Sequence, residues 1–234
     1  MKTFLLVDDN AAFAENLAEI LRDCGHEVVI ANGGEMALQA ARERKFDALV
    51  TDMRMPVMNG ARLVHEIRRG DPELPAIVVT AYTGEADLIS ARNEGLLAVL
   101  PKPVPVERLV ELLNQARRGA LVALVEDDAA LADNLGEALR DHGFSAVMAH
   151  SIADAERFGD VRPFVALVDR RVPGGPDGQA MRLLSSRFPG LPQIVITAFA
   201  EGMTETSAPV FPKPFDTATL LRAIERMYDG RSAP

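Results

Sequence analysis

Short runs of apolar residues alternate along the chain with longer segments in which apolar residues recur every three or four positions. Short apolar runs are typical of buried strands, and the three-to-four periodicity is typical of amphipathic helices. In the first half of the chain we expect strands at 2–7, 28–31, 48–51, 76–79 and 97–100. We expect the helices that follow them at 11–24, 36–44, from Gly60 through Ile67, 85–94 and 106–118.

Five repeats of strand then helix predict a parallel sheet with helices on both faces. Directly after Gly119-Ala120 the series begins again with the apolar run 121–125. The chain is therefore expected to form two consecutive (βα)5 doubly wound α/β domains, at 1–119 and 120–234. Because the linker is very short, the two domains should have restricted relative freedom.

The polar residues at the strand ends recur as well, so the second half repeats both the expected elements and the candidate functional residues of the first. The first half has Asp8, Asp9, Asp52, Thr80 and Lys102, and the second has Asp127, Asp128, Asp169, Thr197 and Lys213. The third-strand aspartate and the threonine are 28 positions apart in both halves, but the distance from threonine to lysine falls from 22 to 16 positions. We therefore expect the second half to have lost its fourth helix, leaving a loop or one distorted turn at 201–209.

Composition narrows the classes of function. The 234 residues include 25 basic and 34 acidic side chains, for a net charge of −9, which argues against a nucleic-acid partner. No apolar segment approaches the ~20 residues that span a bilayer, and Asp8-Asp9 interrupts the only candidate signal peptide. The single Cys24 suits a reducing cytoplasm, and its place on an apolar helix face predicts core packing.

The strand-end residues predict a phosphoryl-transfer site. The carboxyl ends of parallel strands form the ligand-binding edge of such sheets. Three carboxylates gathered there repel one another unless a hard divalent cation is present, and Mg²⁺ suits carboxylate and phosphate oxygens. A carboxylate beside Mg²⁺ can attack phosphorus to form an aspartyl phosphate. A lysine ammonium and a threonine hydroxyl can then neutralise the phosphoryl oxygens.

These motifs, in this order, resemble the receiver domain of bacterial two-component response regulators. The first half carries Val7-Asp8-Asp9, Asp52-Met-Arg-Met-Pro56, Gly60, Thr80-Ala81 and Lys102-Pro103. The second half carries Glu126-Asp127-Asp128, Asp169-Arg-Arg-Val-Pro173, Thr197-Ala198 and Lys213-Pro214. The resemblance covers essentially the whole chain and implies two flavodoxin-like receiver domains in tandem.

The resemblance also implies a role for each motif residue. The phosphoacceptors would be Asp52 and Asp169. The direct Mg²⁺ ligands would be Asp9 and Asp128, assisted through water by Asp8 and Asp127. The backbone carbonyls that complete the metal site would be those of Arg54 and Arg171. The lysines that pair with the acyl phosphate would be Lys102 and Lys213, and the hydroxyls that move to bond it those of Thr80 and Thr197. Both Lys-Pro bonds are expected to be cis.

Three departures from the family pattern matter. Val99 and Val210 stand three positions before the lysines, where many family members have an aromatic switch residue. The loop from Asp169 to Gly178 is one residue longer than its counterpart, and its Gly and Pro content predicts an altered rim. The missing fourth helix removes surface used elsewhere in the family for dimerisation or output. The first domain would then hold the conventional signalling face, and the second would act as a partner, a phosphate sink or an assembly surface.

The favoured function is a stand-alone tandem receiver without an output domain, not an enzyme with separate substrate turnover. It would take phosphate from a histidine kinase or a histidine phosphotransfer protein and signal to a downstream protein target, with a homodimer left open. One alternative is the receiver portion of a larger regulator, such as a diguanylate cyclase or a hybrid kinase. A second is an adaptor whose second receiver is a phosphate sink or an interaction surface. A purely structural adaptor with unused sites is disfavoured by the complete residue sets. A phosphatase of the haloacid dehalogenase type is disfavoured, because Arg54 and Arg171 stand where such enzymes need an acid.

Overall fold

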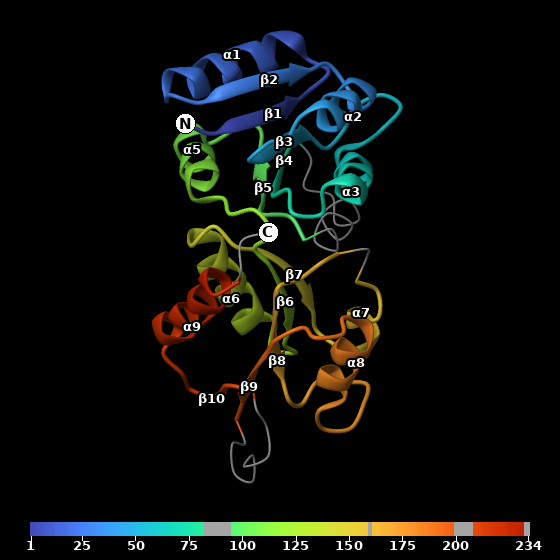
Figure 1. The fold of residues 1–234 in the computed structure, drawn as a ribbon, viewed down its shortest axis with the longest axis vertical. Helices are drawn as coiled ribbons and strands as arrows, with labels where there is room; N and C mark the ends of the chain where they lie inside the picture. The colour runs from blue at the N-terminus through green and yellow to red at the C-terminus, as the bar shows by residue number, and fades with distance from the viewer. Residues whose placement is uncertain (82–94, 159–160, 199–207, 232–234) are drawn as a thin grey trace.

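Two parallel five-stranded sheets form the protein, one in each half of the chain (Figure 1). The structure, a computed structural model, describes residues 1–81, 95–158, 161–198 and 208–231. The first half contains β1 (Thr3–Val7), α1 (Ala11–Asp23), β2 (Glu27–Ala31), α2 (Gly34–Glu43), β3 (Ala48–Asp52), α3 (Gly60–Gly70), β4 (Ala76–Thr80), β5 (Ala98–Pro101) and α5 (Val106–Gln115). The second half contains β6 (Leu121–Val125), α6 (Ala129–Asp141), β7 (Ser145–Ala149), α7 (Ile152–Ala155), β8 (Val165–Asp169), α8 (Gln179–Arg187), β9 (Gln193–Thr197), β10 (Val210–Pro212) and α9 (Thr217–Asp229).

Both sheets have the same strand order. The first runs β2-β1-β3-β4-β5, and the second, taken from its β7 edge, runs β7-β6-β8-β9-β10. Every neighbouring pair is parallel. The order reverses direction beside β1 and beside β6, so the carboxyl ends of these strands and of β3 and β8 border the ligand-binding crevice. The expected fold class, two consecutive doubly wound α/β sheets, is confirmed.

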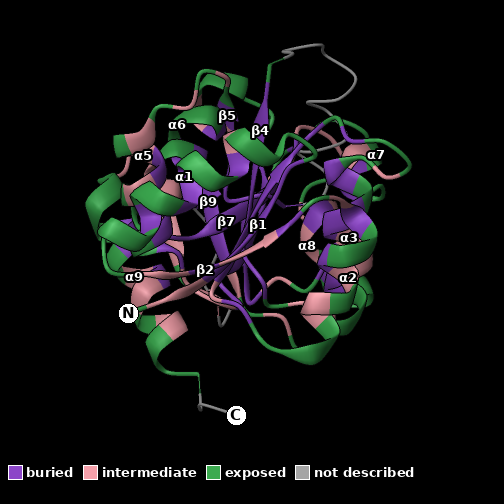
Figure 2. Cartoon of the chain, turned by 90° about the horizontal axis from the view of Figure 1, so that it is seen from above, coloured by how far each residue is buried: buried purple, intermediate pink, exposed green. Residues whose placement is uncertain are grey.

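Each sheet is covered on both faces, which explains why its strands are continuous apolar runs. Phe4 and Leu6 of β1 point into a core shared with α1 and α5, whereas Leu5 and Val7 point into a core shared with α2 and α3. In β6, alternate residues divide in the same way between two cores. Figure 2 shows the strands as the buried centre and the outer faces of the helices as exposed. Alternation along a strand therefore sets which core a residue joins, not whether it is buried.

Local signals fix several helix ends. The side chain of Asn10 accepts a hydrogen bond from the Phe13 amide and so caps the start of α1. The helix expected at 106–118 ends earlier, at Gln115. The ammonium of Lys2 donates to the carbonyls of Leu113, Asn114 and Ala116. Because this distant lysine satisfies the last carbonyls, the helix ends there and the chain is released towards β6.

The prediction that Cys24 packs in the core is wrong. Cys24 is exposed, and Ile20, about one turn earlier in α1, is 39% exposed. The buried stripe of α1 is made by Ala14, Leu17, Ala18 and Leu21. Cys24 is the residue at which the helix ends, and the next residue turns the chain away with a φ of 87°. The apolar periodicity therefore extended the buried face one turn too far.

Two predictions fall partly or wholly on residues that the structure does not describe. The helix expected at 85–94 lies within 82–94, and most of the expected loop at 201–209 lies within 199–207. The loss of the second half's fourth helix therefore stays a prediction. Among the helices that the structure does describe, none combines the length and apolar character needed to cross a bilayer.

Candidate functional site

The strands of the first half bring their predicted polar residues to one edge of the sheet. Asp8 follows β1, Asp52 ends β3, Thr80 ends β4 and Lys102 follows β5. Three of these residues are buried, with Asp8 1%, Asp52 8% and Thr80 3% exposed. The Lys102 amide donates to the Thr80 carbonyl at 2.8 Å, which ties the lysine's strand end to that of the threonine.

Lys102 joins the two buried aspartates of this edge. Its ammonium lies 2.7 Å from Oδ1 of Asp52 and 2.8 Å from Oδ2 of Asp8. It also lies 4.4 Å from the ring centroid of Phe13, which covers it from α1. Burial lowers the pKa of Lys102, but the hydrogen bonds and charges of Asp52 and Asp8 outweigh it, so the pKa is raised. The lysine is therefore a fixed cation at neutral pH.

The chain after Asp52 folds tightly against the site. The Arg54 amide donates to Oδ2 of Asp52 at 2.8 Å, which orients the carboxylate. Farther along, the Gly60 amide donates to the Met53 carbonyl at 2.9 Å. A Cβ at Gly60 would lie 2.4 Å from the Asp52 carbonyl oxygen, closer than real contacts allow. Glycine is therefore required here because another backbone approaches closely.

The second half repeats this arrangement around Lys213. Its ammonium lies 2.5 Å from Oδ2 of Asp169 and 2.8 Å from Oε1 of Glu126. The Arg171 amide donates to Oδ1 of Asp169 at 2.9 Å, and the Lys213 amide donates to the Thr197 carbonyl at 2.8 Å. As in the first half, the burial that lowers the lysine pKa is outweighed by Asp169 and Glu126, so the pKa is raised. Both Lys-Pro bonds are cis, as predicted.

The predicted pairing of Asp8-Asp9 with Asp127-Asp128 is wrong by one position. Glu126, not Asp127, occupies the place of Asp8, since each follows the first strand of its half and bonds the site lysine. The side chain of Asp128 caps α6 by accepting from the Leu131 amide, as Asn10 caps α1. Asp128 thus serves a helix end, and Asp127 is the counterpart of Asp9. Counting from the strand end to the helix cap, rather than matching acidic pairs, would have found Glu126.

Glu126 is fully buried, but only one of its two carboxylate oxygens is hydrogen-bonded. Its Oε1 accepts from both Lys213 and the Asp128 amide, while Oε2 is buried without a hydrogen bond. Burial raises the pKa of Glu126, against the opposing effect of Lys213. In the first half, Asp8 instead shares its partners between two oxygens, since Oδ1 accepts from the Asn10 amide and Oδ2 from Lys102.

The carboxylates of the second site fit a divalent cation. Oxygens of Glu126, Asp127 and Asp169 all lie within 4.8 Å of one another, the one such group among the described residues. Three carboxylates and one ammonium leave two negative charges uncompensated, and the unbonded Oε2 of Glu126 offers a further ligand atom. Hard oxygen donors in this number suit Mg²⁺ or Ca²⁺. The first site has carboxylates at the corresponding positions, Asp8, Asp9 and Asp52, but their oxygens do not all lie within 4.8 Å of one another.

The rims of the two sites differ, as the longer loop predicted. In the second half, Arg171 Nε donates to Asp177 at 3.0 Å across the loop. The Gly178 amide donates to the Arg170 carbonyl at 2.8 Å, and this hydrogen bond joins the two ends of the loop. Gly178 has a φ of 75°. In the first half, by contrast, the Asn59 side chain caps α3 directly. Arg170, Arg171 and Asp177 therefore lie beside the second site. At the corresponding place in the first site, the loop ends at the Asn59 cap of α3.

Comparison with known proteins gives the family. The first half, at residues 4–114, matches the family model described as the response regulator receiver domain. A response regulator receiver protein of Anaeromyxobacter sp. strain Fw109-5 is 59% identical over 231 residues, which cover 99% of this chain and 97% of that protein. The chain belongs to the response regulator receiver family. The resemblance drawn from the strand-end motifs is confirmed.

Other relatives of this receiver protein match over about half of it. The transcriptional regulatory protein ZraR of Escherichia coli strain K12 is 35% identical over 112 residues, which are 48% of this chain and 25% of that protein. Among solved structures, a receiver domain protein of Methanospirillum hungatei is 29% identical, with a TM-score of 0.47, and covers 49% of this chain and 91% of that one. The receiver domain of the sensor histidine kinase PA1611 of Pseudomonas aeruginosa, solved with magnesium in its active-site cleft, has 29% identity and a TM-score of 0.45 and covers 49% and 94%.

Proposed function

We propose that this protein is a two-component response regulator with two receiver domains, at 1–119 and 120–234, each of which accepts a phosphoryl group. The acceptors are Asp52 and Asp169. The observation that carries the proposal is the lysine held between two buried carboxylates at the carboxyl edge of both sheets. An ammonium in that position can move from the carboxylate to the phosphoryl group once the acceptor is phosphorylated.

The donor is a histidine kinase or a histidine phosphotransfer protein. One oxygen of the Asp52 carboxylate attacks the phosphorus of the phosphohistidine. The new O–P bond forms as the P–N bond breaks, and the imidazole leaves with the electron pair. Lys102 then pairs with the phosphoryl oxygens, and the Thr80 hydroxyl, at the end of the neighbouring strand, bonds them as well. Later attack by water restores the carboxylate and releases phosphate.

The residues of both sites suit Mg²⁺ as the resident cation. Asp8, Asp9 and Asp52, with the Arg54 carbonyl, would hold it in the first half. In the second half the corresponding set is Glu126, Asp127, Asp169 and the Arg171 carbonyl, and Glu126 replaces Asp128 in the set expected from sequence. When bound, Mg²⁺ neutralises oxygens of the donor phosphoryl group.

Phosphatase turnover is disfavoured by the same geometry. The residues two positions after the acceptors are Arg54 and Arg171, and the atoms they present to the carboxylates are backbone amides. Neither supplies the general acid that an aspartate-nucleophile phosphatase requires. We propose instead that the protein signals through contacts with a protein target, since its acidic charge disfavours nucleic acid.

The test is a count of phosphates. The protein is incubated with Mg²⁺ and acetyl phosphate, and its intact mass is compared with those of Asp52→Asn and Asp169→Asn. We expect two phosphates on the unaltered chain and one on each variant. If each variant still carried as many phosphates as the unaltered chain, the assignment of Asp52 and Asp169 as acceptors would be refuted. Omitting Mg²⁺, with chelator present, is the matched control and should abolish both additions.

A further inference from the structure

The two halves are tied tightly together where the chain passes between them. The Gly119 amide donates to the Glu73 carbonyl at 2.8 Å, and the hydroxyl of Tyr228 in α9 donates to the Arg118 carbonyl at 2.7 Å. A Cβ at Gly143 would lie 1.9 Å from the Gln115 carbonyl oxygen, so the turn after α6 lies directly against the end of α5. Backbone-to-backbone contact of this kind leaves little room for movement at this end.

Arg117, in the linker, and Arg231, after α9, strengthen this junction. Arg117 lies 4.9 Å from the ring centroid of Phe144 and 3.6 Å from Glu225. Arg231 lies 5.1 Å from the ring centroid of Tyr228 and donates to the Gly119 carbonyl. Each cation therefore joins the linker to aromatic side chains of the second half. The linker end of the interface acts as a fixed pivot.

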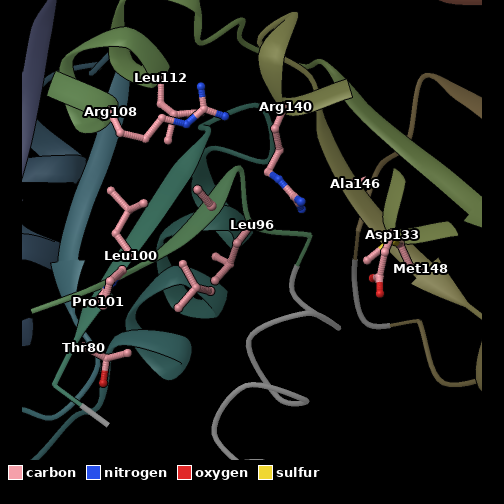
Figure 3. A pocket seen from close by; sticks show the side chains of 12 residues that line it. Thr80, Leu96, Leu100, Pro101, Arg108, Leu112, Asp133, Arg140, Ala146 and Met148 are labelled. Carbon is pink, nitrogen blue, oxygen red and sulfur yellow. The ribbon is translucent and has the colours of Figure 1, made fainter. Parts of the chain in front are cut away.

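Away from the pivot, described residues of the same interface line a cavity of about 400 Å³ that is partly open to solvent (Figure 3). Its walls come from β4, β5 and α5 of the first half and from α6 and β7 of the second. The lining residues used below are Thr80, Val99, Arg108, Arg140 and Met148. The described residues of the two halves therefore do not pack fully against each other here. This end of the interface can open or close without breaking a packed core.

Thr80 places the proposed phosphorylation site at the edge of this cavity. It ends β4 and lines the cavity, and its carbonyl accepts from the Lys102 amide. Pro101, the residue before Lys102, lines the cavity too. The residues that are proposed to rearrange around a phosphoryl group on Asp52 therefore form part of the wall that faces the second half.

The opposite wall is held by few polar contacts. Arg108 of α5 pairs with Asp141 of α6, and this ion pair crosses between the halves. The side chain of Arg140, on the same helix α6, extends into the space between the halves in Figure 3, and its guanidinium makes no ion pair or hydrogen bond with any described residue. Burial lowers its pKa. Among the described residues, the Arg108–Asp141 pair is the ion pair that joins α5 to α6 beside the cavity, and it is exposed, so changing it costs little.

We propose that the second half is the downstream target of the first, and that the cavity transmits the signal. The inference rests on the proposed phosphorylation of Asp52. When Thr80 turns to bond the phosphoryl group, the wall of β4 and β5 changes. Val99 leaves space for that change, because it is small and half-buried. The α6 and β7 wall then shifts about the pivot at Gly119, and the second half changes its orientation or dynamics.

The test measures amide hydrogen exchange in the second half while only the first is phosphorylated. The full chain with Asp169→Asn is incubated with Mg²⁺ and acetyl phosphate, and intact mass gives the phosphate on Asp52. We expect exchange in peptides from α6 and β7 to change by at least roughly threefold. The double variant Asp52→Asn, Asp169→Asn should show no change. Phosphorylated Asp52 with unchanged α6 and β7 would overturn the inference while leaving the proposed function intact.

Two further variants, in the same Asp169→Asn background, identify the route. Thr80→Val is compared with its parent at equal phosphate occupancy of Asp52, as measured by intact mass. At that occupancy it should lose the exchange response, and a retained response would overturn the role of Thr80. Arg108→Gln should weaken the response in α6. Arg157→Gln is its matched control, because Arg157 pairs with Asp154 on the far side of the second half and should leave the response unchanged. Absence of any phosphate on Asp52 would refute the proposed function and, with it, this inference.

Discussion

The ammonium of Lys213 lies 2.8 Å from the carboxylate of Glu126, a glutamate in the place where the first half has an aspartate. The extra methylene changes how the carboxylate is used. Both hydrogen bonds go to Oε1, and Oε2 is left buried and unbonded beside Asp127 and Asp169. The two sites therefore differ in one possible cation ligand. Oε2 of Glu126 accepts no hydrogen bond, whereas both carboxylate oxygens of Asp8 do.

We expect Glu126→Gln to weaken divalent-cation binding at the second site by about tenfold, because ligand charge sets much of the affinity of such sites. Binding is measured by calorimetric titration with Mn²⁺ or Mg²⁺ on the otherwise unaltered chain. Glu137→Gln removes an exposed charge from α6 and serves as the control, with no expected change. Equal affinity in Glu126→Gln and the unaltered protein would exclude Glu126 from the metal site.

Lys102→Met should destabilise the protein more in chelator than in Mg²⁺. The ammonium separates two buried carboxylates, and removing one partner of a buried ion pair costs roughly 3–5 kcal/mol. Mg²⁺ would compensate part of the carboxylate repulsion. Urea unfolding of the variant and the unaltered protein, with and without Mg²⁺, gives the four free energies of unfolding. A loss of stability that does not depend on Mg²⁺ would argue against a cation at this site.

Gly60→Ala should destabilise the first half by about 1–3 kcal/mol, since the new Cβ meets the Asp52 carbonyl at 2.4 Å. The matched control is Gly70→Ala, at the other end of the same helix, where a Cβ meets nothing within 4 Å. That change should stabilise the protein slightly, because alanine loses less backbone entropy on folding. Thermal unfolding should move the two midpoints in opposite directions. A neutral Gly60→Ala would contradict the close approach.

Val57→Gly should stabilise the protein by roughly 1 kcal/mol. Val57 is 89% exposed and has a φ of 69°, a conformation that is strained for a β-branched residue. The second half has Gly174 at the same distance after its aspartate, with a φ of 100°. Because Val57 has little packing to lose, removing its side chain relieves strain at small cost. A lower midpoint of unfolding would mean that Val57 makes a stabilising contact that offsets the strain.

The fold was predictable because its strands are buried on both faces. Continuous apolar runs such as 121–125 and 76–79 identify buried strands directly from the sequence. The ends of β3, β4 and β5 then place Asp52, Thr80 and Lys102 at one edge of the first sheet. Alternation of strand and helix then fixed the parallel order. Helix ends were less predictable, because a distant residue such as Lys2 determines where α5 ends.

The second site was predicted less well than the first. The pair Asp127-Asp128 has the same residue types as Asp8-Asp9. In the structure, however, Asp128 caps α6, and Glu126 is the residue that pairs with Lys213. Two carboxylates of different length can fill one role, so residue type alone misleads. The cavity between the halves could not be foreseen either, because it depends on how α5 and α6 meet.

The most direct test of the account identifies the residue that carries the phosphoryl group. The protein is phosphorylated with acetyl phosphate and Mg²⁺ and then reduced with borohydride, which converts an aspartyl phosphate to homoserine. Peptide mapping by mass spectrometry follows. The account predicts homoserine at positions 52 and 169, and at neither position when the acetyl phosphate is omitted. Phosphate retained on the protein without homoserine at position 52 would contradict it.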